Sequence, residues 1–244
     1  MESGIAVPLT RKKKRFIMPE YTIRPIAHIE SDFTTKFGIP RQAGIVDTLE
    51  ARIVFDGEYA NPDALRGIEG FSHLWLIWQF SENLREGWSP TVRPPRLGGN
   101  ERLGVFATRS PFRPNGLGLS CVRLLRVEKD EKCGVCLAVA GADLMNGTPI
   151  FDIKPYIPYA DCRSDALAGF APDSGAVLEV EFEDGAWERL PPEKRNAIAA
   201  VLANDPRPRY HNDPERVYAM EFAGREIKFR VSGKKLTVLN TDAD

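Results

Sequence analysis

The stretch Leu74-Trp75-Leu76-Ile77-Trp78 is continuously apolar, with polar residues on both sides: Ser72-His73 before it and Gln79 after it. A short apolar run rich in branched and aromatic side chains is typical of a strand in the interior of a sheet. The sequence therefore predicts a strand over Leu74–Phe80, with both of its faces buried.

Outward from this strand, the chain between Tyr21 and about Ala160 has the punctuation of a β protein. Its candidate strands are short, rich in Val, Ile and Phe, and bounded by Gly, Pro and Asn. One short helix is expected at Pro62–Leu65, with Asn61 as its N-cap. The other predicted strands are Ile23–Glu30, Ala51–Phe55, Leu103–Thr108, Leu119–Glu128, Val135–Ala142 and Ile150–Ile153. Many short strands with little helix predict a mainly β fold, built as a closed or half-closed antiparallel barrel.

A loose, polar stretch from Asp161 to Gly175 marks a domain boundary. Beyond it the sequence predicts a small α+β domain, with a helix at Pro192–Ala203 and hairpin turns at Gly224 and Gly233. The strands expected there are Val177–Phe182, Arg216–Phe222, Arg225–Val231 and Lys235–Leu239. We therefore expect a leader at residues 1–18, a β-barrel domain at 19–160 and an α+β domain at 161–244.

The leader is polar and contains a basic run from Arg11 to Arg15. It is predicted to be disordered. Two interpretations stay open: a basic arm that holds RNA, or an artefact of gene assignment with Met18 as the true start. It has no apolar segment of the kind found in secretion signals.

The chain has 244 residues, of which 43% are hydrophobic and 27% are charged, and this composition is ordinary for a soluble protein. No run approaches the ~18 apolar residues that a membrane-spanning helix needs. Four cysteines without a secretion signal favour reduced thiols in a cytoplasm.

Charge is unevenly distributed although the net charge is only −1. The segment from Arg85 to Arg126 holds eight arginines, no lysine and two glutamates. Such a segment is either a solvated face or a local site for phosphate or nucleic acid. The exclusive use of arginine favours the second, because the planar guanidinium suits bidentate phosphate contacts and base stacking.

Three further features of the sequence suggest a metal, catalytic or cofactor site, and each is better explained by a structural role. Cys133-x-x-Cys136 stands without a second cysteine pair or a nearby His, so we expect a structural role and no metal. His73 is expected to be a hydrogen-bonded structural residue, with a catalytic base as the lesser alternative. Gly116-Leu117-Gly118-Leu119-Ser120 does not follow a predicted buried strand or open a helix, so the sequence argues against a Rossmann cofactor site.

Long loops rich in Pro, Gly, Arg and Asn are the remaining feature, and such loops commonly carry a site on a rigid scaffold. They contain PRQAG at Pro40–Gly44, RPPRLGGN at Arg93–Asn100, the end of GVFATRSPFRPNGLGLS at Gly104–Ser120, and DLMNGTPIFDIKPY at Asp143–Tyr156. With GIEGFSHLW at Gly67–Trp75, these strings closely resemble the TrmO (TsaA-like) family. Asp205-Pro206-Arg207-Pro208-Arg209-Tyr210 resembles the C-terminal domain of that family, so the resemblance covers nearly everything after Met18.

The resemblance implies a β-barrel that binds S-adenosylmethionine and methylates N6 of N6-threonylcarbamoyladenosine next to the tRNA anticodon. It implies these cofactor contacts: Pro40, Arg41, Gln42, Ser81, Glu82, Arg109, Leu119, Asp143, Leu144, Met145 and Asn146. The chain departs from the family at three places. Asn146 replaces a common Asp, Gly116-Leu117 replaces Pro-Ile, and Ser81-Glu82 replaces His-Gln.

Arg93, Arg96 and Arg113 form the surface that we expect to contact the phosphates of the tRNA anticodon loop. They are predicted to lie in two loops that flank the strand Leu103–Thr108. A homodimer is expected, partly from the resemblance and partly because Trp88 and Pro94-Pro95 lie in a long apolar loop. No general base can be named from the sequence, and no metal or membrane is expected as a partner.

Two alternative functions stay open beside the tRNA methyltransferase. One is a β-barrel module that binds RNA or a nucleotide without methyl transfer. The other is a methyltransferase that uses the same cofactor on a different substrate.

Overall fold

The computed structural model describes residues 20–83, 87–131, 134–173, 175, 177–208, 211 and 213–243. The predicted leader at residues 1–18 and Cys133 lie outside these ranges, and Met1–Pro19 are not described. Strands predominate over helices, as the sequence predicts. None of the helices in the described part of the chain is long and apolar enough to cross a membrane.

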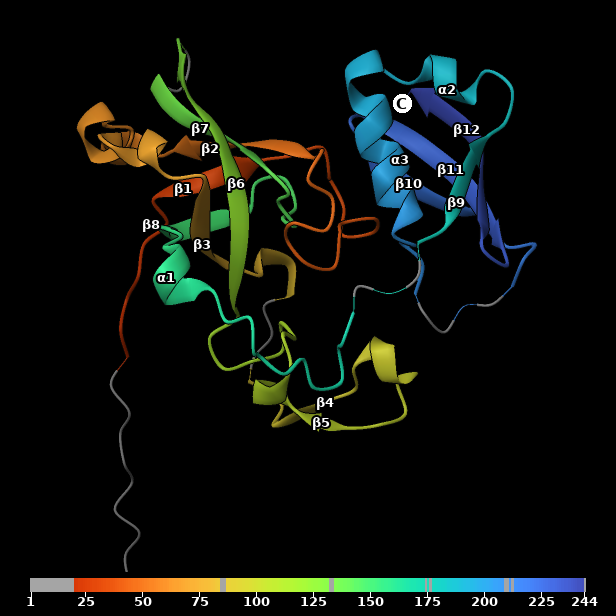
Figure 1. The fold of residues 1–244 in the computed structure, drawn as a ribbon, viewed down its shortest axis with the longest axis horizontal. Coiled ribbons are helices and arrows are strands. Elements are labelled where there is room, and N and C mark those ends of the chain that lie inside the picture. The colour runs from red at the N-terminus through yellow and green to blue at the C-terminus, as the bar shows by residue number, and fades with distance from the viewer. Residues whose placement is uncertain are drawn as a thin grey trace, which may run out of the picture.

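Six strands pair in the order β1-β2-β7-β6-β3-β8, and β8 pairs with β1 to close a barrel. All of these pairs are antiparallel. Figure 1 shows the barrel with the long strand β6 running down its front. The strands are β1 Ala27–Glu30, β2 Glu50–Phe55, β3 His73–Gln79, β6 Leu117–Asp130, β7 Gly134–Ala140 and β8 Pro149–Pro155.

Strand β3 buries only one of its faces. Leu74, Leu76 and Trp78 point into the barrel core, whereas Trp75 and Ile77 on the other face are half-buried. The prediction of two buried faces is therefore wrong. The outer face is covered in part by Tyr156, whose ring centroid lies 5.8 Å from that of Trp75, and this cover makes an apolar outer residue tolerable.

The predicted strand Leu103–Thr108 is also wrong. Only Leu103–Gly104 form a strand (β5), which pairs with β4 (Thr91–Val92) in a separate two-stranded sheet outside the barrel. Val105–Ala107 form a single 3₁₀ turn, closed by the N–H of Thr108 donating to the carbonyl of Val105. Val105 is buried and Phe106 is exposed, so a half-buried turn reproduced the alternation that predicts a strand.

Short 3₁₀ helices connect the strands, and one of them confirms the predicted cap. The side chain of Asn61 accepts a hydrogen bond from the backbone N–H of Asp63 at 3.0 Å. Strand β1 begins four residues later than the predicted Ile23. The 3₁₀ helices are Gly57–Tyr59, Pro62–Leu65, Ile68–Gly70, Ser81–Asn83, Pro95–Leu97, Val105–Ala107 and Pro192–Lys194.

The C-terminal part is a four-stranded sheet with helices packed on it (Figure 1), which agrees with the predicted α+β content. The strand order is β10-β11-β12-β9, with β9 parallel to β12. Gly224 and Gly233 lie in its tight turns with positive φ, as predicted. The elements of this part are β9 Glu179–Phe182, α2 Ala186–Arg189, α3 Arg195–Ala203, β10 Tyr218–Phe222, β11 Arg225–Ser232 and β12 Lys235–Ala243. The short helix α1, Pro158–Asp161, follows β8 and lies beside the barrel (Figure 1).

The connection from β1 to β2 leaves the barrel and packs into the core of the C-terminal sheet. Phe33, Val46 and Leu49 are buried in that second core. Phe37 stacks on Tyr218 and on Phe229, with both pairs of ring centroids 6.4 Å apart. The Pro40–Gly44 loop is thus held by both parts of the protein. The residues before it pack on the C-terminal sheet, and the N–H of Gly44 donates to the carbonyl of Gly141 at 2.8 Å, next to the barrel.

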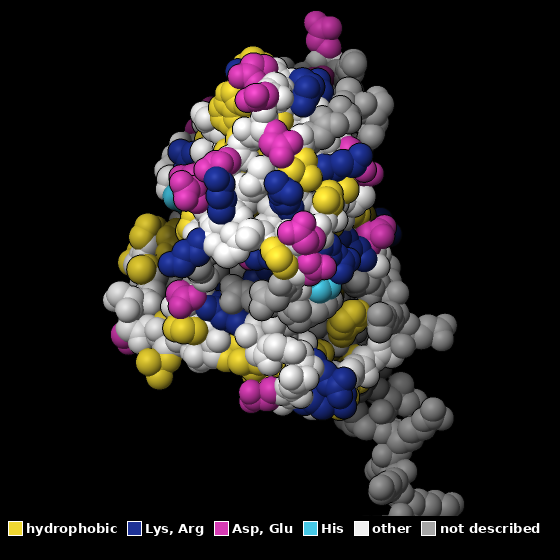
Figure 2. Space-filling view, turned by 90° about the vertical axis from the view of Figure 1, so that its right-hand side faces the viewer, with side chains coloured by type: hydrophobic (Ala, Val, Ile, Leu, Met, Phe, Trp, Pro, Cys, Tyr) yellow, Lys and Arg dark blue, Asp and Glu magenta, His cyan; other side chains and the backbone are white. Residues whose placement is uncertain are grey.

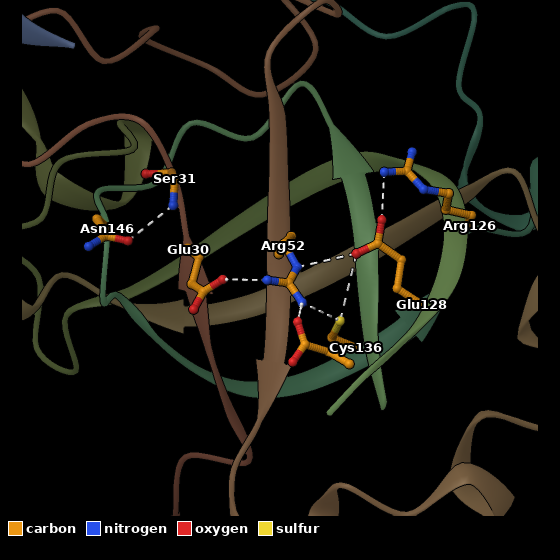
Figure 3. Close-up of polar contacts among 8 residues, drawn as sticks. Glu30, Ser31, Arg52, Arg126, Glu128, Cys136 and Asn146 are labelled. Carbon is orange, nitrogen blue, oxygen red and sulfur yellow. Dashed lines mark hydrogen bonds and ion pairs between the residues drawn. The ribbon is translucent and has the colours of Figure 1, made fainter. Parts of the chain in front are cut away.

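Arg52 on the outer face of β2 ties neighbouring strands together (Figure 3). Its guanidinium bonds to Glu30 on β1 at 3.2 Å and to Asp130 and Glu128 on β6 at 2.7 and 3.2 Å. The same group lies 3.1 Å from the buried Sγ of Cys136 on β7. Cys136 thereby has a packing and hydrogen-bonding role in the wall of the barrel.

Candidate functional site

A cavity of about 320 Å³ opens at one end of the barrel. Its wall comes from the β1–β2 connection, the end of β3 with the turn after it, the start of β6, and the β7–β8 turn. These segments are far apart in the sequence, and barrel closure brings their ends together. The volume lies in the range of pockets that hold small ligands.

Nine of the eleven residues predicted for the cofactor line this one cavity. They are Pro40, Arg41, Gln42, Ser81, Glu82, Arg109, Leu119, Asp143 and Met145. Leu144 and Asn146 do not line it.

Leu144 and Asn146 hold the β7–β8 turn in place. The side chain of Leu144 is buried in the barrel core, and its carbonyl accepts from Oγ of Ser31 at 3.0 Å. The side-chain oxygen of Asn146 accepts from the N–H of Ser31 at 3.1 Å, as Figure 3 shows. An amide oxygen serves this purpose as well as a carboxylate, so the departure at Asn146 leaves the turn intact.

Asp143 is the most strongly buried acid of the cavity, and a hydrogen-bond chain fixes it. The indole Nε1 of Trp78 donates to Oγ of Ser120 at 2.9 Å, and Ser120 donates to Oδ1 of Asp143 at 2.5 Å. Burial raises the pKa of the Asp143 carboxyl above its ordinary value, although the Ser120 hydrogen bond and the charge of Arg109 act against the rise. Ser120 and Trp78 were not predicted as site residues.

Gly118 explains how the Trp78 ring reaches this position. The two residues are partners across β3 and β6, and a Cβ on Gly118 would lie 2.3 Å from Cε2 of the indole. Only glycine lets the ring lie flat against the neighbouring strand. The Gly-Leu-Gly-Leu-Ser motif therefore shapes the cavity wall, which is a role unrelated to a Rossmann phosphate loop.

Arg41 faces the C-terminal part of the chain. Its Nη2 donates to the backbone carbonyls of Arg207 at 2.8 Å and of Asp205 at 3.3 Å. The guanidinium of Arg207 in turn forms a fork on the Asp205 carboxylate, with bonds of 2.8 and 3.0 Å. The turn at 205–207 is thus a rigid acceptor for Arg41.

Charges of both signs meet around the cavity. Lys36 connects the β1–β2 connection to the turn after β3, because its Nζ donates to the carbonyl of Glu82 at 3.0 Å. Arg109 donates to the side-chain oxygen of Gln42. The apolar part of the wall includes Trp78, Phe80, Leu117, Leu119 and Met145. Lys36 and Phe80 lie outside the strings that carry the resemblance, and Leu117 lies inside one of them without having been predicted as a contact.

A groove of about 2350 Å³ adjoins the cavity and shares Arg41, Gln42 and Arg109 with it. The three arginines predicted for tRNA, Arg93, Arg96 and Arg113, all line this groove. They do not flank a barrel strand, because residues 103–108 lie outside the barrel. Their states differ: Arg96 forms an ion pair with Asp173, Arg113 reaches the carbonyl of Thr108 at 3.4 Å, and Arg93 is exposed.

His73 lies away from the cavity. Its Nδ1 is 2.9 Å from Oγ of Ser72, and its ring packs edge-on to Tyr156 with centroids 6.2 Å apart. This geometry favours the structural role. Within the described ranges, no group of three or more His, Cys, Asp and Glu side chains is placed to hold a metal ion.

Family models match both parts of the chain. The model described as the tRNA-methyltransferase O N-terminal domain matches residues 28–162, and the TrmO C-terminal domain matches residues 175–244. The first match ends at residue 162 and the second begins at residue 175, so the interval between them lies within the stretch Asp161–Gly175 in which the sequence predicts a boundary.

Individual relatives agree with these matches. A tRNA (adenine(37)-N6)-methyltransferase of Escherichia coli K12 is 41% identical over 224 residues, which cover 88% of this chain and 95% of the relative. A protein of Pseudomonas aeruginosa named putative S-adenosylmethionine-dependent methyltransferase RcsF is 40% identical over 208 residues, or 82% of this chain and 88% of the relative. The crystal structure of TrmO from Pseudomonas aeruginosa superposes with a TM-score of 0.77 at 31% identity, covering 92% of this chain and 99% of that one.

Proposed function

Because the chain belongs to the tRNA-methyltransferase O family, we propose that it is an S-adenosylmethionine-dependent tRNA methyltransferase that acts on adenine 37. The acceptor is N6 of N6-threonylcarbamoyladenosine, next to the anticodon. The observation that carries the proposal is the convergence of nine predicted cofactor residues on one cavity, in a chain that the family models match over residues 28–162 and 175–244.

The residues of the cavity fit S-adenosylmethionine. This cofactor carries a sulfonium, an ammonium and a carboxylate beside an adenine ring. Glu82 and Asp143 offer negative charge to the cationic groups, and Lys36, Arg41 and Arg109 offer positive charge to the carboxylate. Trp78, Phe80 and Leu119 provide the apolar surface that the adenine ring needs.

When bound, S-adenosylmethionine supplies an activated methyl group, so the protein has mainly to align the reactants. The buried Trp78–Ser120–Asp143 chain fixes one carboxylate in a set direction, which orients a cationic ligand group without a reorganisation cost. The β1–β2 connection, fastened by Arg41, closes one side of the cavity and limits access of water. These residues would hold the cofactor at the inner end of the groove, through which an acceptor nitrogen would approach it.

The groove supplies the path for the substrate. It is lined by Arg93, Arg96 and Arg113, whose positive charges suit the phosphates of tRNA. The groove leads to Arg109 and Gln42, which also line the cofactor cavity. An anticodon loop suits such a path, because its bases can be unstacked and reached from the side.

Three further points are part of the proposal. Residues 19–160 act as the cofactor domain and 161–244 as a second domain that supports the site through the Arg41 contact. The protein works in the cytoplasm, where tRNA is modified. It assembles as a homodimer, which light scattering over a range of concentrations tests directly.

The experiment that tests the function is mass spectrometry of tRNA nucleosides from a strain that lacks the gene. We expect N6-threonylcarbamoyladenosine without its N6-methyl group, and recovery of the methyl group on complementation. An unchanged nucleoside profile would contradict the assignment of the acceptor. Loss of a methyl group from another nucleoside would identify a methyltransferase with a different substrate.

A further inference from the structure

Trp88 and Phe106 form a stacked pair of aromatic rings that is open to solvent. Trp88 precedes β4 and Phe106 follows β5, so the short hairpin between them carries one ring at each end. Their ring centroids are 6.0 Å apart with an interplanar angle of 26°. The rings are 51% and 73% exposed, which leaves a large apolar face uncovered.

The surroundings of this pair carry charge of almost one sign. Both rings line the groove described above, together with seven arginines. Asp173 is the one acid among the described residues of its lining, and Arg96 already pairs with it. By contrast, Figure 2 shows Lys and Arg interspersed with Asp and Glu over the upper part of the molecule, where the C-terminal sheet lies. The groove is therefore the place whose charge complements a polyanion.

The groove is also continuous with the cofactor cavity. Arg41, Gln42, Gln79, Phe80 and Arg109 line both. A nucleic-acid segment that lies in the groove can thus insert one base toward the cavity and leave its neighbours over the hairpin. Exposed aromatic rings beside arginines are the arrangement by which proteins bind unstacked bases.

We propose that the Trp88–Phe106 pair is a stacking platform for an unstacked base of the anticodon loop, adjacent to the base that is methylated. Arg93 and Arg102, on the same hairpin and exposed, hold the phosphates on either side of that base. This inference rests on the proposed function and adds a recognition site to it. The platform contributes affinity with little base selectivity, because every base has a π-face.

The test measures binding of an anticodon stem-loop RNA by fluorescence anisotropy at several salt concentrations. Trp88→Leu and Phe106→Leu keep an apolar side chain and remove the ring. Each is expected to weaken binding about tenfold, in line with the free energy of base stacking, and to leave the salt slope unchanged. Trp88→Phe should retain most of the affinity. Tyr159→Leu is the matched control, because Tyr159 is 89% exposed and lies outside the groove.

Two readouts separate the outcomes. Calorimetry with S-adenosylmethionine should give the parent value for every leucine variant, which excludes misfolding. If the leucine variants bind RNA as the parent does while the parent methylates tRNA, the platform is overturned and the proposed function stands. If the parent binds neither RNA nor cofactor, the proposed function itself fails.

The alternative occupant is a second copy of this chain, which is the partner expected from the sequence for the apolar loop that holds Trp88. Light scattering that shows a dimer for the parent and a monomer for Trp88→Leu, with RNA affinity per chain unchanged, would assign the pair to a dimer interface and overturn the proposal.

Discussion

The guanidinium of Arg41 donates to the backbone carbonyl of Arg207 at 2.8 Å, and this bond joins the wall of the cavity to the C-terminal part of the chain. The guanidinium of Arg207 in turn donates to the carboxylate of Asp205. The backbone carbonyl of Asp205 also accepts from Arg41. One turn of the C-terminal part thus positions a residue that lines the cavity. The second domain therefore has a role in the site, beyond any contact of its own with RNA.

Arg41→Ala should weaken binding of S-adenosylmethionine at least tenfold, or ~1.4 kcal/mol. The change removes both a positive charge from the cavity and the tether to residues 205–207. Isothermal titration calorimetry measures it, with Arg195→Ala as a control, because Arg195 also donates to backbone carbonyls but lies away from the cavity. Equal affinity for parent and Arg41→Ala would remove Arg41 from the site.

Arg207→Gln should weaken cofactor binding less than Arg41→Ala does, because it loosens the acceptor turn and leaves the Arg41 charge in place. In a double-mutant cycle, the two changes should show a coupling of about 0.5–3 kcal/mol, as residues of one hydrogen-bond network do. Strict additivity would mean that the C-terminal turn does not act through Arg41.

Gly38→Ala should destabilise the protein by more than Gly67→Ala. Both glycines have a similar positive φ, of 98° and 88°, so the conformational strain is matched. At Gly38 the added Cβ would lie 2.3 Å from Cε of Met220 on β10, whereas at Gly67 nothing lies within 4 Å. The difference in melting temperature isolates the packing of the β1–β2 connection on the C-terminal sheet. We also expect weaker cofactor binding for Gly38→Ala alone, and equal melting temperatures would contradict this packing.

Asp143→Asn should make the stability of the cofactor-free protein less sensitive to pH. Burial raises the pKa of Asp143 in the folded protein above its ordinary value of 3.8, so the folded state binds this proton more tightly than the unfolded chain does. Above pH ~3.8, stability is consequently lost as pH rises through the folded pKa. The variant lacks this loss and can keep the hydrogen bond from Ser120.

Melting curves of parent and Asp143→Asn over a pH series should therefore diverge toward neutral pH, with the variant the more stable. Cofactor affinity should fall in the same variant, because the negative charge is gone. A difference in melting temperature that stays constant at all pH values would show that burial does not raise the pKa of the Asp143 carboxyl.

Arg93→Ala and Arg96→Ala should separate phosphate binding from bracing. Arg93 is exposed, and its loss should reduce the salt slope of tRNA binding by ~1 with no change in melting temperature. Arg96 pairs with Asp173 in the connection to the C-terminal part, so its loss should also lower the melting temperature. Binding assays at several salt concentrations beside melting curves check both. An unchanged salt slope for Arg93→Ala would contradict a phosphate contact.

Much of the fold could be predicted from local patterns, because alternation and turn residues act over a few positions. Asn61 and Gly224 lie where capping and turn chemistry put them. The error at Leu103–Thr108 arose because a turn with one buried and one exposed residue has the same pattern as a strand. The half-exposed Trp75 depends on Tyr156, which is far along the chain, and no local pattern reveals that contact.

The site shows the same division. The family resemblance brought out residues such as Pro40 and Asp143, which line the cavity. It also included Leu144, which faces the core, because a linear motif does not tell which way each side chain of a turn points. Lys36 and the tie between Arg41 and Arg207 arise from the crossing of the β1–β2 connection to the other core, a tertiary feature without a sequence signal.

The most direct test of the central claim is methyl transfer by the purified protein, using S-adenosylmethionine labelled in its methyl group and tRNA that carries N6-threonylcarbamoyladenosine at position 37. We predict that label enters that nucleoside as one N6-methyl group, that tRNA with unmodified adenine 37 accepts none, and that Asp143→Asn lowers the rate strongly. Absence of label from the tRNA, with the parent protein folded and the cofactor bound, would contradict the account.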